Sequence, residues 1–181
     1  MSSTKAFIAS ILDQFYRAEQ VDLLHLALTN VLEMVSAGEV DIFLDQRQKN
    51  ASQKKAFVQK IIGSIESPEL KSAFQAELDA DNLEFFRERS LGTTLSLLQR
   101  ETEKIKIVRL HVALEFKEKD FREMVALLEE QLNAKVALSI SVERSLLGGA
   151  IIQYGTALRD STLKSRLEVF REHWKQAAVE A

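Results

Sequence analysis

Histidines and paired carboxylates are the residue types in this chain that could act as metal ligands or as acid–base catalysts. The chain has three histidines, His25, His111 and His173, which are far apart in sequence and lack ligand-like spacing. A metal site needs several converging ligands, so we interpret these histidines as structural or solvated side chains. Glu129 and Glu130 are adjacent, which places their side chains about 100° apart on a helix and indicates a solvated face rather than an acid–base pair.

The Gly148-Gly149 pair could cradle a phosphate, but its surroundings argue against this. The Lys-Ser/Thr that completes a phosphate loop is missing, and a strand is predicted after the glycines where a helix should begin. The chain also lacks the GxSxG nucleophile turn and the HExxH zinc motif. Small basic clusters at 46–49 and 53–55 are most simply solvated faces, with contact to a phosphate or an acidic partner as the alternative. We therefore predict no enzyme activity, no cofactor and no metal.

The composition of the chain excludes or disfavours several classes of protein. The 181 residues include no cysteine, which excludes disulfides, cysteine-ligated zinc and iron–sulfur clusters. A formal net charge of −3 without a basic stripe disfavours nucleic acid as a partner. No apolar run reaches the roughly 20 residues that span a bilayer. We expect a soluble protein that meets a membrane only through its partners.

The first part of the chain predicts successive helices, because its apolar residues recur at helical spacing. Ser67-Pro68-Glu69 is a strong helix start, with a capping serine and proline at the first helical position. A longer helix is predicted over 83–104, and its adjacent Phe85 and Phe86 should not both face one core, so one is expected to be half exposed. The other predicted helices carry apolar stripes at Phe7, Ile11 and Phe15; at 23–35; at 56–62; and at Leu70, Phe74 and Leu78, and a short piece over 40–44 separates the second and third stripes.

Near Ile105 the hydrophobic period changes from helical to alternating. The pattern predicts a strand over 108–114, a helix over 117–132, strands on either side of Gly148-Gly149, and a final helix capped by residues 160–162. The apolar stripe of that helix is Leu163, Leu167, Phe170 and Trp174, which we expect to pack within the second unit. The predicted fold class is α+β, mostly α: a helical bundle over 1–105, followed by a small βαββα unit over 106–181.

The second unit carries the most specific motif of the chain. Gly148-Gly149 precedes the apolar strand residues Ile151-Ile152, and the positions that follow at fixed offsets are Gly155, Asp160 and Arg166-Leu167. Together these residues resemble the C-terminal signature of the delta subunit of F-type ATP synthases, the oligomycin-sensitivity-conferring subunit of mitochondria. Ser161-Thr162 replaces the Gly-Ser of that family and keeps a hydroxyl at the helix cap. The N-terminal half resembles the family in helix pattern only.

The resemblance implies a non-catalytic stator subunit, with an N-terminal six-helix bundle that holds the N-terminal helices of the alpha subunits. The second unit would hold the b-type peripheral stalk, so that ion-driven rotation is coupled to ATP synthesis. By family analogy, alpha binds between the first and fifth helices, at Phe7, Ile11, Phe15, Leu70, Phe74 and Leu78. The absence of a transit-like N-terminus favours a bacterial origin and a position on the cytoplasmic face of the cell membrane, as a peripheral part of the synthase.

Three alternatives compete with the stator interpretation. A generic helical adaptor would share the bundle but need not carry the pattern from Gly148 to Asp160. A nucleic-acid-binding regulator would need a basic face, and an enzyme would need a polar constellation. Independently of the family, Gly148-Gly149 is predicted to be structural, as a tight link between two strands.

Overall fold

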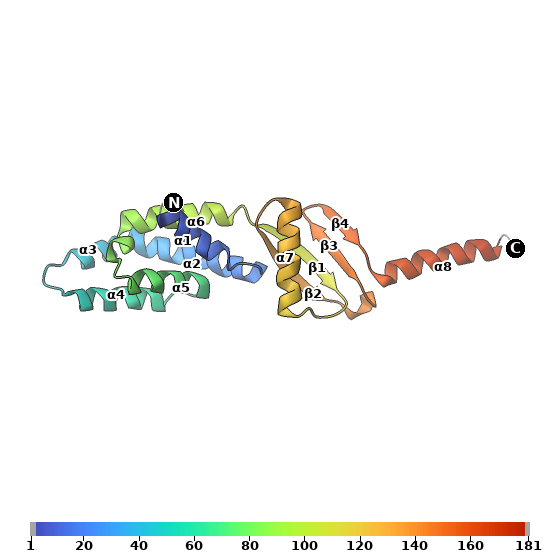
Figure 1. Ribbon diagram of the computed structural model, residues 1–181, viewed down its shortest axis with the longest axis horizontal. Coiled ribbons are helices and arrows are strands. Elements are labelled where there is room, and N and C mark those ends of the chain that lie inside the picture. Colours follow the sequence, from blue (N-terminus) through green and yellow to red (C-terminus); the bar gives the residue numbers. More distant parts are fainter. Residues whose placement is uncertain (1–2, 180–181) are drawn as a thin grey trace. The chain divides into compact units, whose positions relative to one another are not determined.

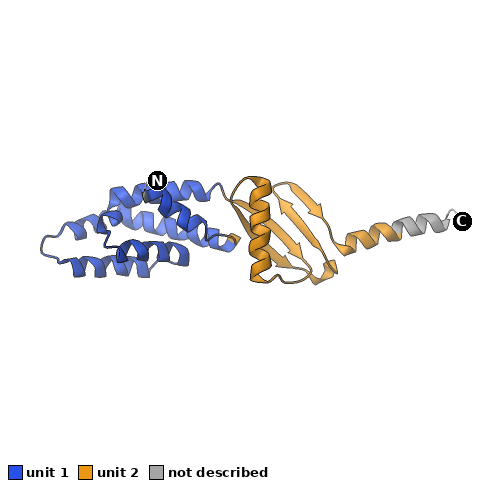
Figure 2. Ribbon diagram, viewed as in Figure 1, with its two compact units in different colours: residues 1–15, 19–104 blue, residues 16–18, 105–181 orange. Residues whose placement is uncertain are grey.

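The computed structural model describes residues 3–179, with side chains from residue 4 to residue 171. The chain divides into two compact units, residues 1–15 with 19–104 and residues 16–18 with 105–181 (Figure 2). The architecture is α+β and mostly helical, with one four-stranded sheet among the described residues (Figure 1).

The first unit is helical, and two of its helices, α4 and α5, begin where capping residues predict. Asn50 forms a reciprocal capping box with Gln53, and Ser67 accepts a hydrogen bond from the Leu70 N–H just before Pro68. Gly38 ends the second helix in the left-handed region, with φ of +71°. The helices are α1 (Ser3–Leu12), α2 (Ala18–Ser36), α3 (Glu39–Asp45), α4 (Ala51–Gly63), α5 (Pro68–Asp79), the 3₁₀ helix η1 (Leu83–Phe86) and α6 (Glu88–Thr102).

The predicted long helix over 83–104 is broken, and the break explains the fate of the two adjacent phenylalanines. Phe85 and Phe86 lie in η1, and an extended Arg87 separates them from α6. Because a short 3₁₀ turn rather than a continuous α-helix carries the rings, both are buried, at 8% and 2% exposure. Phe85 lies 4.9 Å from Phe7 and Phe86 lies 5.7 Å from Phe74, measured between ring centroids. The expectation of a half-exposed phenylalanine was wrong.

The second unit is a mixed sheet with the order β2-β1-β3-β4. β1 (Lys106–Val112) pairs parallel with β2 (Val136–Val142) and antiparallel with β3 (Ala150–Tyr154), and β3 pairs antiparallel with β4 (Ala157–Asp160). A parallel pair needs a crossover, which α7 (Glu118–Leu132) supplies. One core joins α7 to this sheet: Val108, Leu110, Val112, Phe121, Val125, Val136 and Leu138.

Two predictions for the second unit need correction. β1 lies between β2 and β3 in the sheet, and residues 143–149 connect them, so Gly148-Gly149 does not form a tight link between these two strands. The connection contains the 3₁₀ helix η2 (Arg144–Leu146). The unit also has a fourth strand that the βαββα pattern omitted. β4 is exposed along its whole length, so its sequence has no alternation of buried and exposed residues that would predict a strand. The local feature that marks it is Gly155, which adopts a positive φ in the turn between β3 and β4.

Candidate partner-binding surfaces

The six residues predicted to line a groove between α1 and α5 are buried in the first unit. None is more than 7% exposed, and α1 packs directly against α5. Phe7 and Phe74 stack across this contact with ring centroids 6.1 Å apart. These side chains therefore hold the two helices together, and a partner helix over this pair would have to contact their exposed neighbours. The residues in question are Phe7, Ile11 and Phe15 from the first helix and its end, and Leu70, Phe74 and Leu78 from α5.

Helical spacing identifies the exposed residues next to these six buried side chains. One flank of α1 contributes Ile8, Ala9 and Leu12 to a hollow of about 480 Å³ against α6, so Ala6 and Ser10 lie on the opposite flank. On α5, the Gln75 side chain bonds to Gln59 of α4 at 2.8 Å. The flank of α5 away from α4 presents Ala73 and Ala76. On the outer seam of the α1–α5 pair, Ala6, Ser10, Ala73 and Ala76 are small side chains, which lets another helix approach closely.

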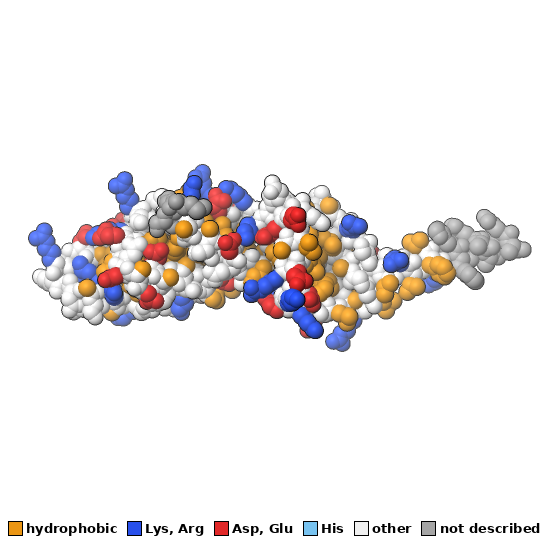
Figure 3. Space-filling view, in the orientation of Figure 1, with side chains coloured by type: hydrophobic (Ala, Val, Ile, Leu, Met, Phe, Trp, Pro, Cys, Tyr) orange, Lys and Arg blue, Asp and Glu red, His pale blue; other side chains and the backbone are white. Residues whose placement is uncertain are grey.

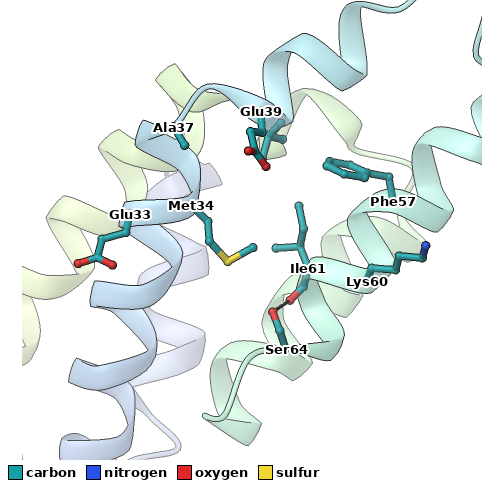
Figure 4. Close-up of a pocket in the computed structure, with 9 residues that line it drawn as sticks. Glu33, Met34, Ala37, Glu39, Phe57, Lys60, Ile61 and Ser64 are labelled. Carbon is teal, nitrogen blue, oxygen red and sulfur yellow. Dashed lines mark hydrogen bonds between the residues drawn. The ribbon is translucent and has the colours of Figure 1, made fainter.

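A second hollow of about 600 Å³ lies between α2, α3 and α4 (Figure 4). Figure 4 shows Met34 of α2 and Ile61 of α4 pointing toward one another across it, with Phe57 at one end. Glu33, Glu39 and Lys60 also line this hollow. The Ser64 hydroxyl, another polar group at its wall, donates to the Ile61 carbonyl at 2.7 Å. With few polar groups free to converge, this hollow suits apolar side chains better than a polar ligand.

The residues considered for chemistry that the structure describes do not come together in one cluster. Among the described residues, no three metal-ligating side chains come together. On the sheet, Nδ1 of His111 lies 2.7 Å from Oγ of Ser141 and 2.8 Å from Oε1 of Glu143. A proton relay needs the serine on one ring nitrogen and the carboxylate on the other, so this cluster cannot act as a triad. His25 is exposed on α2, and His173 lies outside the described side chains.

The Gly148-Gly149 motif builds the joint at which the last helix, α8 (Leu163–Val179), begins. The Gly148 carbonyl accepts from the Leu163 N–H at 2.9 Å. Gly149 has φ of +78°, and a Cβ on it would collide with the carbonyl oxygen of Ser161. A Cβ on Gly148 would meet only the flexible side chain of Leu163, with Cδ1 at 2.7 Å and Cγ at 3.3 Å. The two glycines thus make close approach possible, and Gly149 carries the backbone requirement.

Asp160 completes this joint by capping. Its Oδ1 accepts from the Thr162 N–H at 2.8 Å, and its Oδ2 accepts from the Ser165 hydroxyl. The Thr162 hydroxyl in turn accepts from the Ser165 N–H at 3.2 Å, as predicted for a helix start. The hydrogen bond from Ser165, followed by those from Thr162, lowers the pKa of Asp160 below its ordinary value of 3.8. Arg166 and Leu167, which complete the motif in sequence, are exposed on α8, and Arg166 meets the joint only through its backbone N–H, which donates to the Thr162 carbonyl at 3.3 Å.

The described part of the apolar stripe of α8 is largely exposed rather than fully buried. Leu163, Leu167 and Phe170 are 46%, 55% and 63% exposed. Figure 3 shows hydrophobic side chains open to solvent along this helix. Trp174, the fourth member, lies outside the described side chains. An exposed stripe of large apolar residues on one helix is typical of a partner-binding surface.

Comparison with known proteins gives this arrangement a family context. The model of the family described as ATP synthase delta (OSCP) subunit matches residues 10–173 and so covers most of both units. No helix among the described residues has the length and apolar character to cross a membrane.

Individual relatives agree with the family match. The chain is 26% identical over 153 residues to an ATP synthase subunit delta of Clostridioides difficile, covering 83% of each chain. It is 27% identical over 146 residues to one of Teredinibacter turnerae, covering 81% of each. A shorter match, 37% over 76 residues, links it to one of Aliivibrio salmonicida and covers 42% of this chain and 43% of that relative.

Proposed function

The chain belongs to the ATP synthase delta (OSCP) subunit family, and we propose from this membership that it is a stator subunit of an F-type ATP synthase. The observation that carries the proposal is a family match that spans both units rather than one motif. It favours a stator over a generic helical adaptor. In this role the subunit does no chemistry and needs no cofactor. It resists torque through passive protein–protein contacts while the shaft turns.

The first unit is the proposed contact to the catalytic head. An amphipathic helix at the N-terminus of an alpha subunit would bind along the outer seam of α1 and α5. The small side chains of Ala6, Ser10, Ala73 and Ala76 support this site, because they permit close helix packing over a rigid aromatic core.

The second unit is the proposed contact to the b-type peripheral stalk. The stripe of Leu163, Leu167 and Phe170 supports this assignment, since it offers a ridge of large apolar side chains that are about half exposed or more. Through the stalk, the subunit would be a peripheral part of the complex on the cytoplasmic face of the bacterial cell membrane.

The test uses membrane vesicles that carry the synthase with this subunit truncated after Thr162, which removes α8. The head should keep its ATP hydrolysis, because the first unit is intact, whereas proton-driven ATP synthesis should be lost. A second variant, Leu167→Gln with Phe170→Gln, should reproduce the loss without removing any backbone. Synthesis at the wild-type rate in both variants would show that this chain is not the stator link.

A further inference from the structure

Residues Tyr16, Arg17 and Ala18 belong to the second unit, although they lie in sequence between the two halves of the first (Figure 2). Their backbone runs beside β2: Arg17 forms a parallel bridge with Leu138, and the Leu138 N–H donates to the Tyr16 carbonyl at 2.9 Å. In the sheet order, β2 is an edge strand. An uncovered edge is a template for unwanted pairing, and here the chain itself occupies part of it.

The side chains of this segment hold it against α7. The Arg17 guanidinium pairs with Glu118 at 2.7 Å and lies 4.4 Å from the ring centroid of Phe121. The Tyr16 ring meets Phe121 edge-on at 5.8 Å, and Arg122 lies over its face at 4.7 Å. Such contacts between a cation and an aromatic face add to the attraction of the ion pair.

Titration behaviour is consistent with this packing. Hydrogen bonds from Tyr16 and then from Arg17 lower the pKa of Glu118, and the hydrogen bond to Glu118 raises the pKa of Arg17. Both partners therefore stay charged over a wide range of pH around neutrality.

We propose that residues 16–18 are a strap: an intramolecular strand that completes the second unit by covering the edge of β2 and that the Arg17–Glu118 ion pair holds closed. The occupant of this edge is thus a segment of the same chain. A fragment that starts at residue 105 would therefore lack residues 16–18, which belong to the second unit.

The strap also changes how the two units are connected. The chain passes from one unit to the other at three peptide bonds, 15–16, 18–19 and 104–105. Without the strap, the chain would cross between the units once, at 104–105. With the strap in place, it also crosses at 15–16 and at 18–19. Release of the strap would expose both the β2 edge and the Phe121 face.

The experiment measures strap opening in the full-length chain with two probes. The first is trypsin cleavage after Arg17, which needs the segment to leave the sheet. The second is hydrogen exchange of the Leu138 amide, which the Tyr16 carbonyl protects. Glu118→Gln removes the ion pair and keeps the shape. The matched control is Asp120→Asn, which removes another acid from the first turn of the same helix.

Glu118→Gln should speed both cleavage and exchange by about 2- to 5-fold, the equilibrium equivalent of an exposed ion pair. Asp120→Asn should leave both rates within about 1.5-fold of the wild type. Tyr16→Ala, which removes the ring contacts, should speed both further. If Glu118→Gln and Asp120→Asn have equal effects, or if the wild-type Leu138 amide exchanges as fast as in Tyr16→Ala, the strap does not exist as described. Neither readout depends on the stator assignment.

Discussion

Gly148 and Gly149 are adjacent, but their backbones carry different constraints. Gly149→Ala forces a Cβ into the Ser161 carbonyl at a positive φ, so we expect it to lower the free energy of unfolding by about 1–3 kcal/mol. Gly148→Ala meets only the movable tip of Leu163, so we expect a loss below about 1 kcal/mol. Urea unfolding of both variants measures the difference. Equal losses would mean that the glycines share one role, as the sequence alone suggested.

Asp160 gives the α8 joint a predictable dependence on pH. Because its pKa is lower in the folded chain than its ordinary value of 3.8, its stabilising effect is fully present above that value and is lost as pH falls through the lower, folded pKa. Asp160→Asn removes the charge, so it should melt at a lower temperature than the wild type near neutral pH. The gap should close in acid, and a gap that widens below 3.8 would contradict the assignment.

Among the elements, the α1–α5 pair offers the sharpest test of head binding. Ser10→Arg places a long cation on the proposed seam, while the lost Ser10 hydroxyl bond is only a local one to the Phe7 carbonyl. Stability should therefore change by less than about 0.5 kcal/mol. Affinity for a peptide of the alpha N-terminus should fall by at least about tenfold, measured by calorimetry.

Ser52→Arg is the matched control, because Ser52 is an exposed serine on α4, away from the seam. It should bind the peptide as the wild type does. Equal weakening by the two arginines would point to a general charge effect. Unchanged binding by Ser10→Arg would move the site to another face of the bundle.

At the scale of the whole molecule, the predicted absence of a nucleotide site can be tested. We expect the purified chain to give no heat on titration with Mg-ATP, because the phosphate-loop Lys-Ser/Thr is missing after Gly148-Gly149. A more stringent test uses the intact synthase. The nucleotide affinity of the head should be the same with and without α8, while the coupling of ion flow to ATP synthesis should differ. Saturable ATP binding by the isolated chain would require a role beyond mechanical linkage.

The sequence alone determined where several helices start, because local contacts decide this, although it did not predict the break at Arg87 or strand β4. Ser67-Pro68 fixed the start of α5, the Asn50 capping box fixed that of α4, and the change of period near Ile105 marked the passage from helices to strands. The mostly helical α+β class followed from these features. The family was also within reach, since its motif is contiguous from Gly148 to Leu167.

Only the tertiary structure decided which distant segments meet. Arg17 pairs with Glu118 across 101 positions, and no local pattern around Tyr16 predicts a place beside β2. The strand order and the joint burial of Phe85 and Phe86 are likewise non-local. The stripe on α8 shows the same limit in another form: amphipathic spacing tells that a helix needs an apolar partner, but only packing tells whether the same chain supplies it.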